Sequence, residues 1–342
     1  MSSVEPTLCE TEQEYLNTLS LTNDSWWEKD NQCDWIFRGQ KSSDRLIPSL
    51  YRNRGKTSEL TDNHVFDNTY RNLIYGIPNL STVIVNIIET TVQHIKDEEI
   101  KKLSTVIKAA FIELGQTEKF LERCNRILLP TPTLQLFKGQ PYGKNSTDYF
   151  YNNLEPYITS FIKQLHCKSS CGYGSLFVRE YLEAMALARH HSVSSRLLDW
   201  TEDPLIAAFF SVANSNANDG ICVWALNKRF LRTNSGYGQI AFYDKLNRVG
   251  LEFMHLQKGL FTDMLGLDGY YYEHGKWPNL DQYLLKTYFI SNSNPYPQST
   301  YLKKIELKLN STKRSGLLKR LERMGINKYT LMPTYDNVSG SL

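Results

Sequence analysis

Residues 35–40 read Trp-Ile-Phe-Arg-Gly-Gln, and residues 189–201 read Arg-His-His-Ser-Val-Ser-Ser-Arg-Leu-Leu-Asp-Trp-Thr. Each stretch places fixed polar groups inside a strongly apolar frame. Arg38 follows three apolar residues and Asp199 stands between two leucines and a tryptophan, so both charges are costly to bury without a partner. Because the two stretches lie far apart in the sequence, they predict a single polar site that the fold assembles.

The composition is that of an ordinary globular protein. Of the 342 residues, 41% are hydrophobic and 22% are charged, so the chain can build one large core or two modest ones. A net charge of +3 is too small to demand a nucleic-acid partner, although it permits local basic patches. No apolar run is long enough to span a bilayer, and residues 1–5 do not resemble a signal peptide. Six scattered cysteines favour reduced thiols, so we expect a cytoplasmic protein with no membrane segment.

Local patterns predict both helices and strands. Asp203 followed by Pro204 predicts a helix start, because aspartate caps a helix and proline fits its first position. The helix at 204–213 is apolar all round and is therefore expected to be buried. Strands are expected at 34–38, where Gly39 ends the strand, at 220–226 and at 301–309. Further helices are expected at 64–76, at 175–191 and at 315–324, where Gly325 ends the last one.

These elements predict an α+β fold with a mixed central sheet, flanking helices and a largely helical insertion. Spacings of three and four between apolar residues from Val83 to Ile112 are typical of amphipathic helices that pack together. We therefore divide the chain into an N-terminal segment at 1–30, a core made of 31–76 and 173–342, and a helical insertion at 77–172. The insertion is expected to carry specificity for a partner or substrate.

The two stretches resemble motifs of the FRG domain, a family named for its Phe-Arg-Gly motif. Residues 37–40 supply that motif, and residues 190–201 resemble the family's histidine followed by Pro-Thr-Arg-Leu-Leu-Asp-Trp-Thr. Residues 46–52, 257–262 and 325–333 are similar to further family motifs. The resemblance therefore covers the chain from about residue 35 to the C-terminus, with a gap in the middle.

The chain departs from the family pattern at three positions of the second stretch. Arg189 stands where glutamine is expected, Ser192 where glycine is expected and Ser194 where proline is expected. The changes bear on the shape of this loop, while the motif's histidine, arginine and aspartate are in place.

The FRG core is in turn similar to the ADP-ribosyltransferase fold, in which a strand-borne arginine holds NAD. This resemblance implies an NAD-dependent, ADP-ribosyltransferase-like toxin or phage-defence effector. It implies NAD as the substrate, and a nucleic acid (RNA favoured) or a protein as the acceptor of ADP-ribose. It also implies an antitoxin-like partner.

The resemblance assigns roles to individual residues. Arg38 is expected on the NAD phosphates or ribose, since its planar fork suits a phosphate, and Gly39 is expected to let a ligand approach the backbone. His190 lies at a helix C-terminus, which stabilises a protonated imidazole, and is expected to orient the nicotinamide side. The expected catalytic residues are Arg38, His190, Asp199 and Gln257, and the expected cofactor-binding residues are Arg38, Gly39, Gln40, Arg196 and Thr262. No metal site is expected, because His166, Cys167 and Cys171 have only faint metal-like spacing and no second pair nearby.

Alternatives stay open for most of these residues. Arg38 could instead form a structural salt bridge with Asp199, and Asp199 could be a helix cap. A polar group that steadies the oxocarbenium-like transition state has three candidates, namely Gln257, Glu252 and Glu306. The tyrosines at 270–272 could stack on bases or simply pack. The alternative functions are a non-catalytic module that binds phosphate or nucleic acid, and a hydrolase or nuclease that uses His190 and Asp199.

Overall fold

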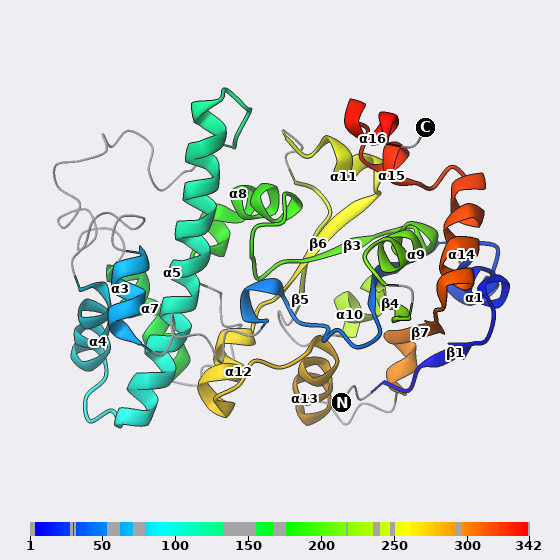
Figure 1. The fold of residues 1–342 in the computed structure, drawn as a ribbon. Helices are drawn as coiled ribbons and strands as arrows, with labels where there is room; N and C mark the ends of the chain where they lie inside the picture. The colour runs from blue at the N-terminus through cyan, green and yellow to red at the C-terminus, as the bar shows by residue number, and fades with distance from the viewer. Residues whose placement is uncertain are drawn as a thin grey trace.

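The computed structural model describes residues 4–27, 30, 32–52, 62–70, 79–132, 155–166, 176–216, 218–234, 240–246, 250–291 and 296–340. Their centre is a sheet of seven strands in the order β1-β7-β4-β2-β3-β6-β5. The β1 strand pairs with β7 in parallel, and all other neighbours are antiparallel. Helices flank this mixed sheet (Figure 1), so the α+β fold class is confirmed. The strands are β1 (Thr7–Cys9), β2 (Trp35–Lys41), β3 (Leu198–Thr201), β4 (Gly220–Asn227), β5 (Ile240–Tyr243), β6 (Gly259–Met264) and β7 (Leu302–Lys308).

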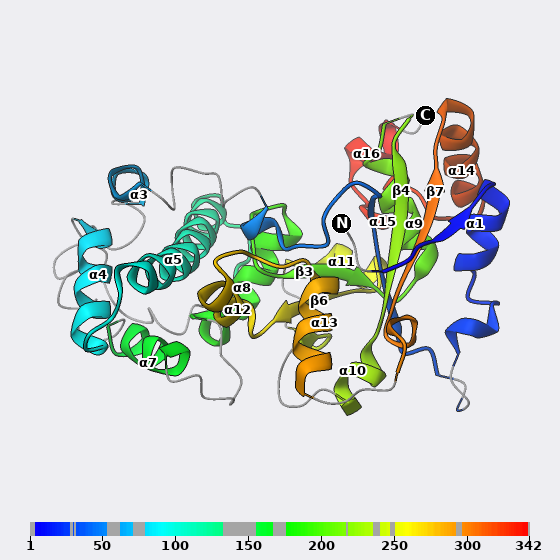
Figure 2. The ribbon, with the colours of Figure 1, turned by 90° about the horizontal axis from the view of Figure 1, so that it is seen from below.

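The sheet opens between β2 and β3. The β2 strand pairs with β4 along its whole length, whereas it meets β3 at a single position, Phe37 opposite Thr201. Figure 2 shows β3 and β6 running across the direction of β4 and β7. Beyond the single pair, the facing backbones of β2 and β3 form no ladder, so other groups have to fill the opening.

One layer of helices packs on β2 and its neighbours. The α9 helix (Pro204–Ala213) lies against β2, with α14 (Ser311–Arg323) and α1 (Glu12–Leu19) beside it (Figure 1). The predicted start of α9 is confirmed, because the Asp203 carboxylate accepts a hydrogen bond from the Leu205 N–H at 3.0 Å. Its apolar residues are largely buried, as the sequence predicts.

A second group of helices packs at the far end of the sheet (Figures 1 and 2). The described residues of the range 77–172 form α4 (Leu80–Thr91), α5 (Asp97–Arg126) and α7 (Glu155–His166), and no strand occurs among them. The α5 helix is 30 residues long and packs against α8 (Val178–His190) and α12 (Leu267–His274). The other helices of the described residues are α3 (Asn63–Tyr70), α10 (Lys228–Asn234), α11 (Glu252–Leu256), α13 (Leu280–Ser291), α15 (Lys328–Leu331) and α16 (Tyr335–Ser339).

Two predicted boundaries are wrong. The β2 strand does not end at Gly39 but runs to Lys41, because residues 39–41 continue the ladder with β4. The helix predicted at 315–324 begins at Ser311, where the Asn310 side chain accepts a hydrogen bond from the Lys313 N–H at 2.8 Å. It is also not the last helix, since α15 and α16 follow it.

One helix prediction extends beyond the described residues. The predicted helix at 64–76 is present as α3, and its residues 71–76 lie outside the described residues.

Among the described helices, none combines the length and apolar character that a membrane crossing requires.

Gly39 is required by the packing of α9 on β2. A Cβ atom at this position would lie 1.8 Å from the Ala207 carbonyl oxygen, far inside van der Waals contact. The backbone that approaches Gly39 closely is therefore that of α9. This differs from the expected role, in which the missing side chain makes room for a ligand.

Replacing Gly39 tests this packing. Gly39→Ala should lower the free energy of unfolding by about 1–3 kcal/mol or more, because the added methyl group forces α9 away from β2. The matched control is Gly316→Ala in α14, where the nearest atom is the flexible Glu12 carboxylate at 2.8 Å; this change should be neutral or stabilising. Chemical denaturation measures both. Equal stability of Gly39→Ala and the wild type would contradict the account.

Candidate functional site

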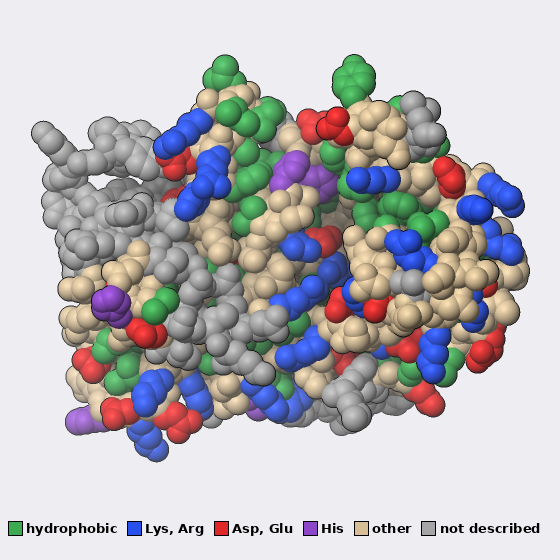
Figure 3. Space-filling view, in the orientation of Figure 1, with side chains coloured by type: hydrophobic (Ala, Val, Ile, Leu, Met, Phe, Trp, Pro, Cys, Tyr) green, Lys and Arg blue, Asp and Glu red, His purple; other side chains and the backbone are tan. Residues whose placement is uncertain are grey.

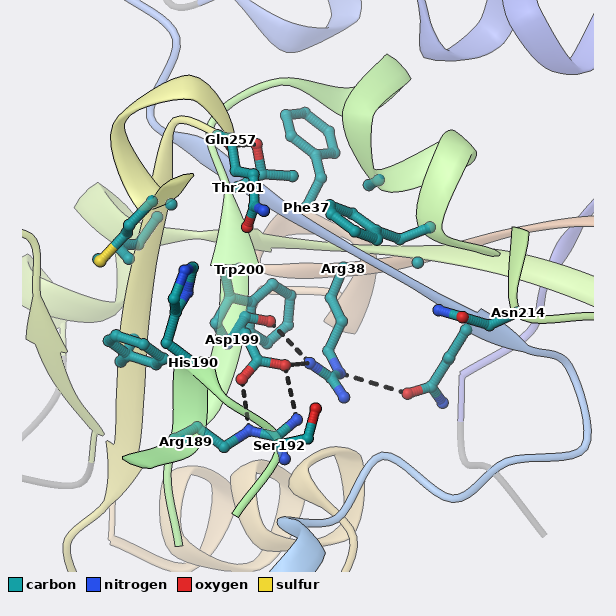
Figure 4. Close-up of a pocket in the computed structure, with 18 of the residues that line it drawn as sticks. Phe37, Arg38, Arg189, His190, Ser192, Asp199, Trp200, Thr201, Asn214 and Gln257 are labelled. Carbon is teal, nitrogen blue, oxygen red and sulfur yellow. Dashed lines mark hydrogen bonds and ion pairs between the residues drawn. The ribbon is translucent and has the colours of Figure 1, made fainter. Parts of the chain in front are cut away.

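The opening between β2 and β3 holds a cleft of about 360 Å³. The α9 helix, the C-terminal end of α8 and the α11–β6 segment close its sides (Figure 4). We call this cavity the arginine cleft, because Arg38, Arg52 and Arg189 line it together with His190 and Asp199. Figure 3 shows Lys and Arg side chains gathered over the middle of this face, with histidines beside them. The volume of the arginine cleft lies within the range of ligand pockets, about 300–1,000 Å³.

Asp199 lies at the centre of the cleft between two guanidinium groups. Arg38 Nη1 donates to Asp199 Oδ2 at 2.7 Å and to the Asp199 carbonyl oxygen at 2.8 Å. Arg189 binds the same carboxylate through both oxygens, with Nε to Oδ1 at 2.5 Å and Nη2 to Oδ2 at 2.8 Å (Figure 4). Arg38 thus bridges β2 to the β3 backbone at the place where the strand ladder is missing.

The two arginines keep Asp199 ionised. Burial alone disfavours the carboxylate, but the charges of Arg189 and Arg38 outweigh it and hold the pKa of Asp199 well below its ordinary value. The Asp199 side chain is still 42% exposed, against 10% for Arg38 and 17% for Arg189. The carboxylate therefore faces the open cleft while the guanidiniums lie behind it. Asp199 belongs to β3, so the alternative that it caps a helix is wrong.

Gln40 fixes the other side of Arg38. Arg38 Nε donates to Gln40 Oε1 at 3.4 Å, and Gln40 Nε2 donates to the Asp44 carbonyl at 2.9 Å. Gln40 is 6% exposed and lines the cleft. Its amide therefore orients the Arg38 guanidinium and has little left to offer a ligand.

His190 is the last residue of α8 and also lines the cleft. Burial lowers its pKa, and the neighbouring His191 lowers it further, against the opposing effect of Asp199 and Glu252. The imidazole is therefore held neutral. Burial outweighs the helix C-terminus, which by itself favours the protonated form.

The expected site residues did not include Arg52, Arg189 or Ser192, all of which line the cleft. Arg189 supplies the second guanidinium. The sequence indicates this role only by placing a positively charged residue one turn before the polar loop, at a position where the family pattern has glutamine. Ser192 adopts a φ of +67°, the left-handed conformation that favours glycine. The glycine expected from the FRG resemblance fits this conformation.

Gln257 lines the cleft, and Thr262 does not. Gln257 is largely engaged with its own neighbours, since its Nε2 donates to the Leu331 carbonyl at 3.2 Å. Thr262 is 1% exposed and its hydroxyl accepts a hydrogen bond from Trp200 Nε1 at 2.9 Å. It therefore satisfies a buried indole. Of the two glutamates considered for the transition state, Glu252 begins α11 and Glu306 lies on β7, and neither lines the cleft.

Arg196 lies in a separate, fully buried charge cluster. Its Nε donates to Glu113 Oε2 of α5 at 2.6 Å, and its Nη1 donates to Asp268 Oδ2 of α12 at 3.4 Å. Arg38, His190 and Asp199 thus converge on one cleft as predicted, but Arg196 does not. This could not be read from the sequence, because the carboxylates that pair with Arg196 come from helices far away in the chain.

Asp263 adjoins this buried cluster. Its Oδ2 is buried without a hydrogen-bond partner among the described residues. Burial raises the pKa of Asp263 to about 7; Glu113 and Asp268 add to the rise, and Arg196 opposes it. A protonated Asp263 fits a cluster that already holds two other acids against one arginine.

The remaining sequence expectations concern metals and stacking. His166 Nδ1 lies 3.2 Å from the Tyr272 hydroxyl, while Cys167 and Cys171 fall outside the described residues. No group of three or more metal-ligating side chains occurs in the part of the chain that the structure describes. Tyr270 and Tyr272 are 7% and 8% exposed, which favours packing over stacking on bases.

Comparison with known proteins identifies one family. The fold and cleft are those of an α+β protein with a basic ligand-sized cavity, and the family model of the FRG domain matches residues 131–220. The match lies within residues 131–220, less than half of the chain, and includes His190, Arg196 and Asp199. The Phe-Arg-Gly motif around Arg38 lies outside the match. No curated protein and no solved structure matches the chain.

The buried cluster makes a prediction about pH. The pKa of Asp263 is about 7 in the folded state, against about 3.9 for an unfolded aspartate. The stability that it contributes is present below the unfolded pKa and is lost as the pH rises through the folded one. As the pH rises from 5 to 8, the free energy of unfolding should therefore fall less for Asp263→Asn than for the wild type, as measured by chemical denaturation. The surface variant Asp24→Asn should follow the wild type. An Asp263→Asn profile that coincides with the wild type would refute the assignment.

Proposed function

We propose that the arginine cleft binds a phosphorylated nucleotide, that this nucleotide is NAD, and that the protein transfers its ADP-ribose to an acceptor. RNA is the favoured acceptor class, with DNA and protein as the others. In this proposal the protein acts in the cytoplasm as a toxin or defence effector, and an antitoxin-like partner neutralises it. The single observation that carries the binding step is the excess of positive charge around Asp199.

The charge balance of the cleft supports an anionic ligand. Arg38 and Arg189 share one carboxylate, and Arg52 lines the same cavity without a carboxylate of its own among the described residues. A cleft with more cations than anions raises the local concentration of phosphates. Guanidinium groups also suit phosphates geometrically, because their parallel N–H donors match two oxygens.

The transfer step requires stabilisation of positive charge at the ribose. The bond between ribose C1′ and nicotinamide breaks, the acceptor oxygen or nitrogen attacks C1′, and the acceptor loses its proton. In the proposal, the ionised Asp199 faces the ribose and provides negative potential. Neutral His190 donates or accepts a hydrogen bond on the nicotinamide side.

Binding without turnover is the second candidate function. Asp199 is already neutralised by two guanidiniums, and within the described residues no glutamate lines the cleft. Both facts weaken the electrostatic support for an oxocarbenium-like state. A hydrolase or nuclease that uses Asp199 as its base is disfavoured, because a carboxylate with a strongly lowered pKa is a poor proton acceptor.

The test combines NAD binding with NAD consumption. Wild-type protein should bind NAD in calorimetry and should release nicotinamide when incubated with labelled NAD and total RNA, DNA or lysate. His190→Phe keeps the ring volume and removes the polar nitrogens, so it should bind NAD but turn over about 100-fold more slowly or worse. The matched control is His191→Phe, at the exposed neighbouring histidine, whose ring centroid lies 5.8 Å from that of Phe120. This control should keep wild-type turnover.

The outcomes separate the candidate functions. Binding with turnover that depends on His190 supports the transferase. Binding with no nicotinamide release under any acceptor leaves the binding module. Arg38→Ala is a poor probe here, because Arg38 also bridges β2 and β3. A wild type that binds no NAD would contradict the proposal.

A further inference from the structure

Of the three arginines that line the cleft, Arg52 is the one without a carboxylate partner among the described residues. It follows the single-turn η2 helix (Ser49–Tyr51), whose Tyr51 is buried and stacks on Trp277 at 4.1 Å. Arg52 Nε donates to the Ile47 carbonyl at 3.3 Å. Among the described residues, no carboxylate forms an ion pair with its guanidinium, and its two terminal nitrogens make no hydrogen bond there. The backbone that carries Arg52 is thus well anchored while the end of the side chain is unmatched.

The surroundings of Arg52 are unfavourable for a cation. Burial lowers the pKa of Arg52, and the nearby charges of Arg38 and Arg189 lower it further, against Asp44 and Asp199. Holding like charges near each other in a partly buried cleft costs stability unless an anion joins them. Two carboxylates line the cleft. Asp199 is held by the other two arginines, and Asp44 forms no ion pair with Arg52 among the described residues.

Arg38 presents one further donor to the same cavity. Its Nη1 is bound to Asp199 and its Nε to Gln40, while Figure 4 shows its remaining nitrogen, Nη2, bonded to none of the residues drawn. The Arg38 side chain as a whole is 10% exposed. Because Asp199 and Gln40 hold the guanidinium from two sides, the direction of Nη2 is fixed before a ligand arrives.

We infer that Arg52 and the Nη2 edge of Arg38 form a phosphate subsite, in which a ligand phosphate is the counter-ion that none of the described residues supplies. The inference rests on the proposed function, because it places a phosphate of the bound nucleotide at this point of the cleft. The three arginines then have different tasks. Arg189 neutralises Asp199, Arg38 bridges the strands and offers one edge, and Arg52 is committed to the ligand.

This division of tasks makes Arg52 separable from the fold. Arg52→Gln should weaken the binding of ADP-ribose about 10-fold or more, the usual effect of losing charge-assisted hydrogen bonds. Its melting temperature should equal or exceed that of the wild type, because no internal ion pair is lost and a like-charge contact is relieved. The matched control is Arg232→Gln, which removes a pair with Asp244 at 3.2 Å outside the cleft and should keep wild-type affinity.

Isothermal titration calorimetry with four probes tests the subsite: ADP-ribose, AMP, adenosine and inorganic pyrophosphate. The expected result is that Arg52→Gln weakens the three phosphate-bearing probes and leaves the affinity for adenosine unchanged. A stronger effect on ADP-ribose and pyrophosphate than on AMP would assign the subsite to a pyrophosphate group, and equal effects would assign it to a single phosphate. Because Arg52→Gln removes a positive charge that attracts the phosphate, the affinity of this variant should also depend less on ionic strength.

The failures of the two proposals differ. Unchanged affinity of Arg52→Gln for ADP-ribose overturns the subsite and leaves nucleotide binding intact. A marked fall in the melting temperature of Arg52→Gln also overturns it, because Arg52 is then a structural residue. A third outcome is that the wild type binds pyrophosphate but not ADP-ribose, and that Arg52→Gln weakens the binding of pyrophosphate. This outcome supports the subsite and contradicts the nucleotide proposal. A wild type that binds none of the probes contradicts both.

Discussion

The carboxylate of Asp199 between Arg38 and Arg189 is the interaction on which the site depends. The β2 and β3 strands share one register pair and then separate, so the backbone of β3 needs another donor. Arg38 provides it by reaching across the opening to the Asp199 carbonyl as well as its side chain. One carboxylate between two guanidiniums keeps the gap open and leaves it positively charged. The same geometry thus accounts for the shape of the arginine cleft and for the class of ligand that suits it.

Hydrogen bonds connect this triad to the helical part of the molecule. Arg189 Nη1 donates to Ser49 Oγ at 3.1 Å, and the same oxygen accepts a bond from the Ser195 N–H at 3.0 Å. Ser195 Oγ in turn donates to Glu113 of α5 at 2.7 Å. Glu113 is fully buried and also holds Arg196. The loop that carries Ser192 is therefore set from two sides, by α5 and by η2, so the long helix contributes to the cleft without lining it.

Local patterns in the sequence were sufficient for some elements and not for others. The α9 helix could be predicted with its cap, because Asp203, Pro204 and an apolar run act within a few residues. The convergence of Arg38 with Asp199 could be predicted as well, since each is a charge in an apolar frame that requires a partner. The burial of Arg196 could not, because its partners Glu113 and Asp268 are distant in sequence and carry no motif. The role of Gly39 was likewise hidden, since it depends on the carbonyl of Ala207 in a helix that packs on it from elsewhere in the chain.

A double-mutant cycle between Arg38 and Asp199 tests the central claim most directly. The free energy of unfolding is measured for the wild type, Arg38→Ala, Asp199→Asn and the double variant, with the same cycle for the exposed pair Arg232 and Asp244 as reference. If the bridge holds the opening between β2 and β3, the coupling energy between Arg38 and Asp199 should be about 1–3 kcal/mol, reduced by the partial exposure of Asp199 but clearly above the reference. Additive effects of the two single changes would show that the strands do not depend on this bridge and would contradict the account.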